Sequence, residues 1–388
     1  MDLALKKMIK GILYFVLIFL FQVSYSQAFI DQKPFKILKK QDGAILAIAF
    51  QSDGKILASG SEDKTCIRWS YPDGLVINSL SGHYSGVRAI FYTPDGKLLC
   101  TGGDKTMRVY KVNGEFIRSF GGPATYIWSL SFNPGNNQVI CGSYDKNLRM
   151  VDFSSGKLSY SFLGHTKNAL AVAFSPDGKL IASGSLDETI KIWDVDTKKC
   201  IQTLTGHGAN IYAVTFTADS KKVISASNDN SIRIWDVNTG KTLSNLIGHT
   251  KGVACVALSS DNTYLLSGSY DTTVKLWDIS TGECIYTFKE HTEPVNCVAF
   301  HPEGNTFASG SSDKTIQIWE LKPEIFVEHY FQKEFEEEYS KSELFFPKDK
   351  AETKANYKIR QEKAETFRKE LVNKYYNLYL TQIKRNPK

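Results

Sequence analysis

Serine, histidine and aspartate recur together along the chain, in the combination that a hydrolytic triad uses. One set consists of His165, Ser183 and Asp187, followed by Trp193. An enzyme does not need several copies of one triad, and this set recurs in later segments, so we reject a catalytic role for it. A buried hydrogen-bond chain from indole N–H to hydroxyl, imidazole and carboxylate would instead lock neighbouring turns. The residues predicted to form such structural networks are His165, Ser183, Asp187, Trp193, His207, Ser225, Asp229, Trp235, His249, Ser267, Asp271, Trp277, Asp313 and Trp319.

The sequence shows no other group of residues with the spacing of a catalytic, metal-binding or phosphate-binding site. No cluster of His, Cys, Asp or Glu has the spacing of a metal site. A glycine-rich phosphate loop and a nucleophile elbow are also missing. We therefore predict no catalytic residue, no metal and no cofactor. The alternative that remains is an enzyme or small-ligand binder whose site lies in a channel at the centre of the fold.

These residues are carried by an internal repeat. Each unit contains an aspartate between two short apolar runs, and successive aspartates lie 41 or 42 residues apart. Within a unit, such as residues 206–246, four runs with strand-like alternation are separated by turn residues. The repeated aspartates are Asp63, Asp104, Asp145, Asp187, Asp229, Asp271 and Asp313.

Two dipeptides mark the repeat more specifically. Gly-His precedes the first run of several units, as at Gly164-His165, and Trp-Asp ends the third run, as at Trp193-Asp194. In both features the chain resembles the WD40 family. The resemblance implies an all-β fold, a seven-bladed propeller over residues 34–322. The last repeat lacks its fourth strand, and "FKILK" at 35–39 is expected to supply it and close the ring.

The second and third repeats depart most from the pattern. By its distance from the aspartate, Cys100 is placed at the serine position of the second repeat, and Cys141 takes it in the third. Tyr110 and Val151 take the tryptophan position, and Pro123 stands where histidine is expected. We expect the third blade to be the less rigid part of the ring.

Variation between repeats also indicates where a partner would bind. Two positions in each repeat should face the rim that carries the aspartate turns: the fifth residue after the histidine position and the residue before the aspartate. WD40 proteins often hold peptides at this rim. Aromatic side chains dominate binding hot spots, although Trp128 could instead fill space left by the missing histidine. The candidate partner-binding rim consists of Arg88, Trp128, Tyr144, Leu170, Leu186, Tyr212 and Tyr270.

The N-terminus has a different character. Lys6, Lys7 and Lys10 precede an apolar run, and small residues Ser24 and Ser26 follow it. This pattern predicts a signal peptide over residues 1–26, and hence an exported, periplasmic or secreted protein. An uncleaved membrane anchor is the alternative. The seven cysteines are interpreted as buried strand residues rather than as disulfides.

The C-terminal segment 323–388 is charged and predicted to be largely helical. Residues 351–388 contain ten Lys or Arg against four Glu, with no glycine and no proline before Pro387. Three roles remain open for this helix: packing on the propeller, binding a partner or a second copy, or lying on an anionic membrane. Its apolar stripe consists of Tyr357, Ala364, Phe367, Leu371, Tyr375 and Leu378.

Together these features predict a non-enzymatic protein-interaction scaffold of the cell envelope or exterior, with a peptide or protein partner on one rim. The net charge of +6 over 388 residues is too mild to indicate nucleic acid. A membrane-anchored assembly subunit is a further alternative, in which the N-terminal segment or the C-terminal helix contacts the membrane.

Overall fold

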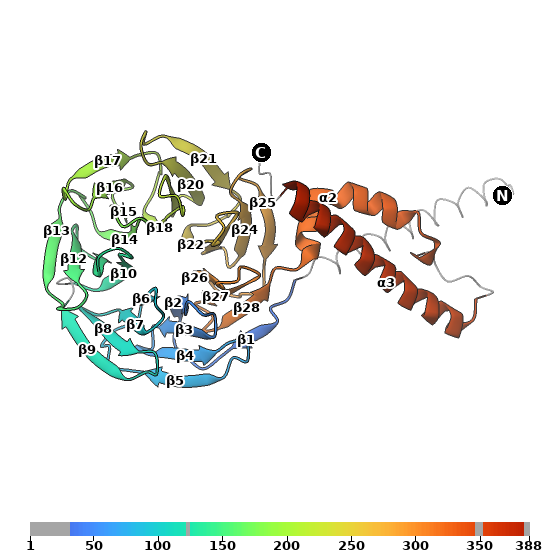
Figure 1. Ribbon diagram of the computed structural model, residues 1–388, viewed down its shortest axis with the longest axis horizontal. Helices are drawn as coiled ribbons and strands as arrows, with labels where there is room; N and C mark the ends of the chain where they lie inside the picture. Colours follow the sequence, from blue (N-terminus) through green and yellow to red (C-terminus); the bar gives the residue numbers. More distant parts are fainter. Residues whose placement is uncertain (1–31, 122–124, 346–351, 384–388) are drawn as a thin grey trace, which may run out of the picture. The chain divides into compact units, whose positions relative to one another are not determined.

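The computed structural model describes residues 32–121, 125–345 and 352–383. In these residues, the chain from 34 to 321 forms one compact unit, a ring of seven antiparallel four-stranded sheets. The first strand of each blade lies nearest the centre of the ring and the fourth lies outermost (Figure 1). The predicted seven-bladed β-propeller is therefore confirmed.

The blades follow one another in chain order, and their strands have nearly equal lengths. Blade one contains β2 (Ile45–Phe50), β3 (Ile56–Ser61), β4 (Cys66–Ser70) and β5 (Val76–Leu80); blade two contains β6 (Ala89–Tyr92), β7 (Leu98–Gly102), β8 (Thr106–Lys111) and β9 (Phe116–Gly121); blade three contains β10 (Ile127–Phe132), β11 (Gln138–Ser143), β12 (Leu148–Asp152) and β13 (Leu158–Phe162). Blade four contains β14 (Ala169–Phe174), β15 (Leu180–Ser185), β16 (Ile190–Asp194) and β17 (Cys200–Leu204); blade five contains β18 (Ile211–Phe216), β19 (Lys222–Ser227), β20 (Ser231–Asp236) and β21 (Thr242–Ile247). Blade six contains β22 (Val253–Leu258), β23 (Tyr264–Ser269), β24 (Val274–Asp278) and β25 (Cys284–Phe288), and blade seven contains β26 (Val295–Phe300), β27 (Thr306–Ser311), β28 (Ile316–Glu320) and β1 (Lys36–Leu38).

The ring closes through its N-terminal strand, as expected. Strand β1 pairs antiparallel with β28, and Ile37 lies opposite Gln317. Pairing the two ends of the repeat in one sheet removes the open edge that a linear array would present. Side chains at the junction reinforce it, since the Tyr71 and Thr306 hydroxyl groups lie 2.7 Å apart.

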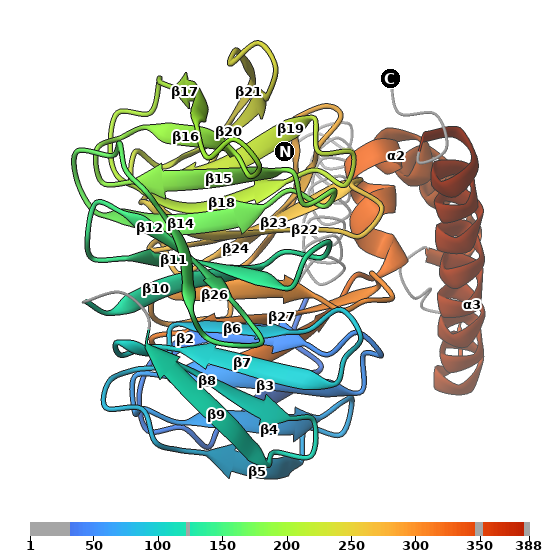
Figure 2. The same ribbon diagram turned by 60° about the vertical axis from the view of Figure 1, so that its left-hand side comes forward.

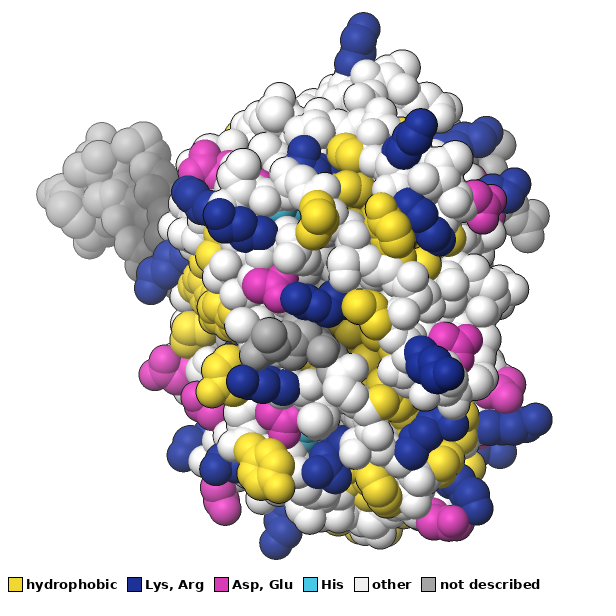
Figure 3. Space-filling model, turned by 90° about the vertical axis from the view of Figure 1, so that its left-hand side faces the viewer, with side chains coloured by type: hydrophobic (Ala, Val, Ile, Leu, Met, Phe, Trp, Pro, Cys, Tyr) yellow, Lys and Arg dark blue, Asp and Glu magenta, His cyan; other side chains and the backbone are white. Residues whose placement is uncertain are grey.

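The core lies between neighbouring blades, where inward-facing β-branched and aromatic side chains pack across the sheets. The interface between blades four and five, for example, buries Ile192, Ile211 and Trp235 in one cluster. The outermost strands are half-solvated, and apolar side chains such as Leu158 and Ile201 remain exposed there. On the side that Figure 3 shows, such side chains are interspersed with Lys and Arg rather than gathered in one patch.

The C-terminal tail forms a helical hairpin. It consists of α2 (Pro323–Ser340), the short 3₁₀ helix η1 (Glu343–Phe345), α3 (Lys354–Leu378) and one π-helical turn, η2 (Tyr379–Ile383). Helix α3 begins later than residue 351 because the Thr353 side chain caps it by accepting from the Asn356 amide. Both helices are visible in Figure 2.

The apolar stripe of α3 packs against α2. Val327 and Phe335 of α2 are buried in one cluster with Leu371, Val372 and Tyr375 of α3. Glu338 ties the two helices by accepting hydrogen bonds from Lys374 and, at 3.1 Å, from the Tyr375 hydroxyl. The stripe thus has a partner inside the tail, which none of the three expected roles anticipated.

Candidate partner-binding rim

A buried hydrogen-bond chain runs through blade five. Trp235 Nε1 donates to Ser225 Oγ at 2.8 Å, and Ser225 Oγ lies 2.8 Å from His207 Nε2. His207 Nδ1 in turn lies 2.8 Å from Asp229 Oδ2. The chain therefore links strands β19 and β20 to the loop that follows β17.

The same arrangement recurs in blades four, six and seven. The histidine Nε2 to serine Oγ distance is 2.7 or 2.8 Å and the histidine Nδ1 to aspartate distance is 2.7 to 2.9 Å in these three blades. The residues concerned are His165, Ser183, Asp187 and Trp193; His249, Ser267, Asp271 and Trp277; and His291, Ser309, Asp313 and Trp319. The sequence prediction had left out His291 and Ser309.

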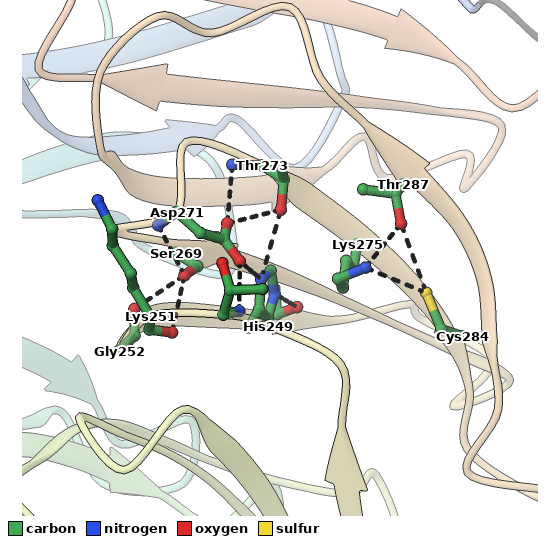
Figure 4. Close-up of polar contacts among 12 residues, drawn as sticks. His249, Lys251, Gly252, Ser269, Asp271, Thr273, Lys275, Cys284 and Thr287 are labelled. Carbon is green, nitrogen blue, oxygen red and sulfur yellow. Dashed lines mark hydrogen bonds and ion pairs between the residues drawn. The ribbon is translucent and has the colours of Figure 1, made fainter.

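Each aspartate joins two loops as well as holding its histidine. In blade six, Asp271 Oδ1 accepts from the Thr273 amide and hydroxyl, while Oδ2 accepts from the Thr250 amide (Figure 4). Burial opposes ionisation of these aspartates, but hydrogen bonds outweigh it. The pKa of Asp229 is lowered to about 2 because Ser231, His207 and the Gly208 amide all donate to it, against the effect of burial. Burial also lowers the pKa of His207, although Asp229 partly offsets this effect.

This geometry does not suit nucleophilic catalysis. The side chain of Ser225 is 0% exposed, and its oxygen already accepts from the Trp235 indole. A triad serine must instead reach a substrate carbonyl while its base takes the proton. Glycine precedes the histidine because the backbone at Gly206 has φ of +146° and a Cβ there would lie 3.3 Å from the Trp235 ring. These residues hold the turns at one end of the blade.

Blade two uses a different hydroxyl from the one predicted. His83 Nε2 lies 2.8 Å from Thr101 Oγ1, and Cys100 is buried in an apolar cluster. The assignment of Cys100 was wrong because the segment between the hydroxyl residue and Asp104 is one residue shorter here. Thr101 follows His83 by 18 residues, the same separation as from His165 to Ser183, and that spacing could have identified it. Tyr110 takes the tryptophan position, and its hydroxyl lies 3.5 Å from the Ser81 carbonyl oxygen.

Blades one and three use substitutes for histidine. In blade one, the Ser59 hydroxyl donates to Gln41 Oε1 at 2.6 Å and accepts from the Trp69 indole at 2.8 Å. In blade three, Arg149 forms an ion pair with Asp145. Pro123 lies outside the described residues, and the lower rigidity expected of this blade stays a prediction.

The remaining potential ligands are dispersed. All seven cysteines are free, but the interpretation of all of them as buried was wrong for Cys200, which is exposed on the outermost strand β17. His301 Nε2 lies 3.1 Å from the Gly54 carbonyl oxygen, where it joins blades seven and one. Within the described ranges, no three His, Cys, Asp or Glu side chains come together in a way that could hold a metal ion.

A β-bulge creates the rim position in six blades. In blade five the pairing of β18 with β19 shifts between Ile211 and Ala213, so Tyr212 has no partner opposite it. Such a bulge bends the strand and re-aims the side chain of the extra residue. Leu46, Trp128, Leu170, Ala254 and Asn296 sit at the same shift in the other five blades. In blade two, Arg88 occupies this place just before β6, and its amide donates to the Gly102 carbonyl.

Aromatic rings contact one another along the rim. The Arg88 guanidinium lies 4.6 Å from the centre of the Trp128 ring, and Trp128 meets Tyr144 edge to face at 5.2 Å. Tyr212 meets Tyr270 in the same way at 5.8 Å. Burial and then the neighbouring Tyr212 raise the pKa of Tyr270, with a smaller contribution from Tyr144. Tyrosines of blades three and five thus contribute to the raised pKa of a tyrosine in blade six. We call Trp128, Tyr144, Tyr212 and Tyr270 the aromatic rim.

The members of the candidate rim differ in exposure. Tyr144 is 42% exposed, and Arg88, Trp128, Leu186, Tyr212 and Tyr270 are half-buried. Leu170 is only 2% exposed, so its expected place on the open rim was wrong. Its bulged position turns the side chain into a packed environment, which the position in the repeat alone did not reveal.

Comparison with protein families identifies the repeat. The WD40 family, described as "WD domain, G-beta repeat", matches residues 32–70, 74–111, 114–152, 156–194, 198–236, 240–278 and 282–320. The chain belongs to the WD40 family. Each family repeat begins with the outermost strand of the preceding blade, which explains why the first match includes β1.

Individual relatives are more distant and match part of the chain. The transcriptional corepressor LEUNIG_HOMOLOG of Arabidopsis thaliana is 26% identical over 132 residues, which are 32% of this chain and 17% of the corepressor. Protein HIR1 of Eremothecium gossypii is 26% identical over 32% of this chain and 17% of its own length. The nuclear distribution protein nudF of Aspergillus niger is 27% identical over 31% of this chain and 32% of its own. The chain therefore covers a third or less of these relatives.

The relatives correct the predicted location. A transcriptional corepressor and a nuclear distribution protein point away from export, so the expectation of a periplasmic or secreted protein was wrong. The predicted signal peptide at 1–26 lies outside the described residues. In the part of the chain that the structure does describe, every helix is too short or too polar to cross a membrane.

Proposed function

We propose that this WD40 protein is a non-enzymatic interaction scaffold that binds a peptide or protein partner through Arg88, Leu186 and the aromatic rim. The observation that carries the proposal is the set of half-exposed aromatic rings at bulged and turn positions of one rim. Tryptophan and tyrosine contribute most to binding hot spots because they bury a large area with little loss of side-chain entropy.

Rigidity supports this role. The buried chains of blades four to seven tie the aspartate turns to the loops beside the rim. A partner that binds to a preformed surface pays less for ordering it. The relatives' names, a transcriptional corepressor and nuclear distribution proteins, are consistent with a role in assembling other proteins.

The tail is proposed as a separate contact element. We place the domain boundary at residues 322–323, with the propeller before it and the helical hairpin after it. Helix α2 is rich in glutamate and α3 in lysine and arginine, so the hairpin presents both charge signs.

The test is selection of peptides from a random phage-displayed library on the purified chain. A fluorescein-labelled copy of a selected peptide is then titrated by fluorescence anisotropy. Trp128→Ala and Tyr212→Ala are expected to weaken binding about thirtyfold or more, as for a hot-spot residue that contributes about 2 kcal/mol. Tyr160→Ala, at a tyrosine on the outermost strand β13 that is 39% exposed, is the matched control and should bind as the wild type does.

Thermal melting distinguishes a binding role from a structural one. The melting temperatures of the two rim variants should stay close to that of the wild type. Unchanged peptide affinity in both variants would refute the proposed rim. A large fall in melting temperature for Trp128→Ala alone would show that Trp128 fills space in its blade.

A further inference from the structure

Arg88 carries a positive charge that the fold does not neutralise. Its guanidinium stacks on Trp128 at 4.6 Å, and among the described residues no carboxylate lies within ion-pair distance of it. Arg149 pairs with Asp145, whereas half-buried Arg108 and Arg233 resemble Arg88 in having no carboxylate partner among the described residues. Arg88 differs from these two because it occupies the rim position of its blade, while they lie within strands β8 and β20. The Trp128 ring holds the Arg88 side chain in place. The hydrogen-bond donors of the Arg88 guanidinium therefore remain available at the edge of the aromatic rim.

Exposed lysines extend this positive charge over adjoining blades. The residue after the repeated aspartate is lysine in blades seven, one, two and three, but glutamate, asparagine and threonine in blades four to six. Glu62 is the acid at the rim position of blade one, beside Lys64. In the residues that the structure describes, none of the four lysines forms an ion pair. They are Lys64, Lys105, Lys146 and Lys314.

The rim therefore has two unlike arcs. The arc around Arg88 is basic, whereas the arc of blades four to six presents Leu186, Tyr212 and Tyr270 and no lysine at the turn position. A partner that satisfies both arcs needs a carboxylate for the first and an apolar side chain for the second. On the side that Figure 3 shows, the exposed apolar side chains of the outermost strands are scattered among charged side chains and indicate no comparable occupant.

We infer that the partner of this rim is an acidic peptide segment, in which an Asp or Glu pairs with Arg88 while a nearby apolar or aromatic residue packs on Tyr144, Tyr212 and Tyr270. This inference rests on the proposed function and adds the chemical class of the partner. Arg88 is then the residue that selects for acid, and the four lysines strengthen the attraction in a salt-dependent way.

The experiment uses the full chain and the peptides selected from the random library. The selected sequences should be enriched in Asp or Glu within a few positions of Phe, Tyr, Trp or Leu. One such peptide is synthesised with its acid and with the matching amide, and both are titrated against the wild type and Arg88→Gln. Lys97→Gln is the matched charge control, because Lys97 lies in the turn before β7, at the opposite end of the sheet from the aspartate turn.

Five results are expected together. Replacing the peptide acid by its amide weakens binding to the wild type about tenfold or more, as for a hydrogen-bonded charge pair. Arg88→Gln causes a similar loss with the acidic peptide, and combining both changes causes little further loss. Arg88→Lys recovers part of the affinity, and Lys97→Gln leaves it unchanged.

Other results would overturn the inference in distinguishable ways. If the peptides bind, lose affinity in Tyr212→Ala and yet tolerate Arg88→Gln or the amide, the proposed function stands and the acidic partner is wrong. If no peptide depends on Tyr212, both fail. If the wild type is a dimer that dissociates in Arg88→Gln, a second copy of the chain occupies the rim. If a fluorescent single-stranded oligonucleotide binds through Arg88, the partner is a nucleic acid. Either result overturns the inference of an acidic peptide partner.

Discussion

Removing one hydroxyl from a buried network should cost far more than removing a thiol from the same position in another blade. Ser225→Ala deletes the oxygen that accepts from Trp235 Nε1 and that also contacts His207 Nε2, both at 2.8 Å. Both nitrogens are then left without this partner in a buried place, and each unsatisfied group costs about 1–3 kcal/mol. We expect a loss of about 3 kcal/mol in the free energy of unfolding. This corresponds to a melting temperature lower by about 6 °C in a domain of this size.

Cys141→Ala is the matched control. Cys141 holds the same position in blade three, but Val151 replaces the tryptophan of other blades, so no indole N–H is available to the thiol. The Cys141 thiol instead contacts Met107 Sδ at 3.6 Å. Its truncation should cost on the order of 1 kcal/mol, mainly from lost packing. Differential scanning calorimetry of the two variants measures the difference directly.

A double-mutant cycle completes the test. If the indole and the hydroxyl act as a pair, Trp235→Phe combined with Ser225→Ala should cost clearly less than the sum of the single changes. Equal losses for Ser225→Ala and Cys141→Ala, or strictly additive effects in the cycle, would refute the argument that the networks hold the turns.

Three further predictions follow from the same structure. The pKa values of Asp229 and Asp313 are lowered to about 2 in the folded state, so their contribution to the free energy of unfolding is present above the ordinary pKa near 4 and disappears as pH falls toward 2. After allowance for solvent screening, this contribution is about 1 kcal/mol for each aspartate. Urea unfolding should show lower stability at pH 3 than at pH 5, and equal stability at the two pH values would contradict the prediction. Arg68 is 1% exposed; its Nη1 lies 3.4 Å from Asn78 Oδ1, and its Nε has no hydrogen-bond partner. Arg68→Met should therefore raise the free energy of unfolding by about 1–3 kcal/mol, because it removes a buried charge. A lower melting temperature of this variant would show that the guanidinium stabilises its site. A chain truncated after Leu321 should keep a cooperatively melting propeller, because β1 and β28 that close the ring both lie before that point; loss of the β-sheet circular dichroism signal would disprove this.

The sequence by itself determined the architecture. The regular spacing from Asp63 to Asp313 sets the number of blades, and the missing fourth strand after Trp319 implies closure by residues 35–39. These features are readable because each blade is a local unit, in which turn residues and alternating apolar residues act over a few positions. The Ser-His-Asp-Trp sets were readable for the same reason, since each network lies within about 30 residues of chain.

The tertiary structure decided what each exceptional residue does. Thr101 takes the hydroxyl position because a shortened turn changes the register, and Arg149 pairs with Asp145 in blade three, one of the two blades that lack the histidine. The bulges that leave Tyr212 half-buried and Leu170 fully buried depend on how two strands pair, and α3 packs against α2. Each outcome arises from contacts between residues that are not adjacent in the chain, and neither residue type nor position in the repeat specifies such contacts.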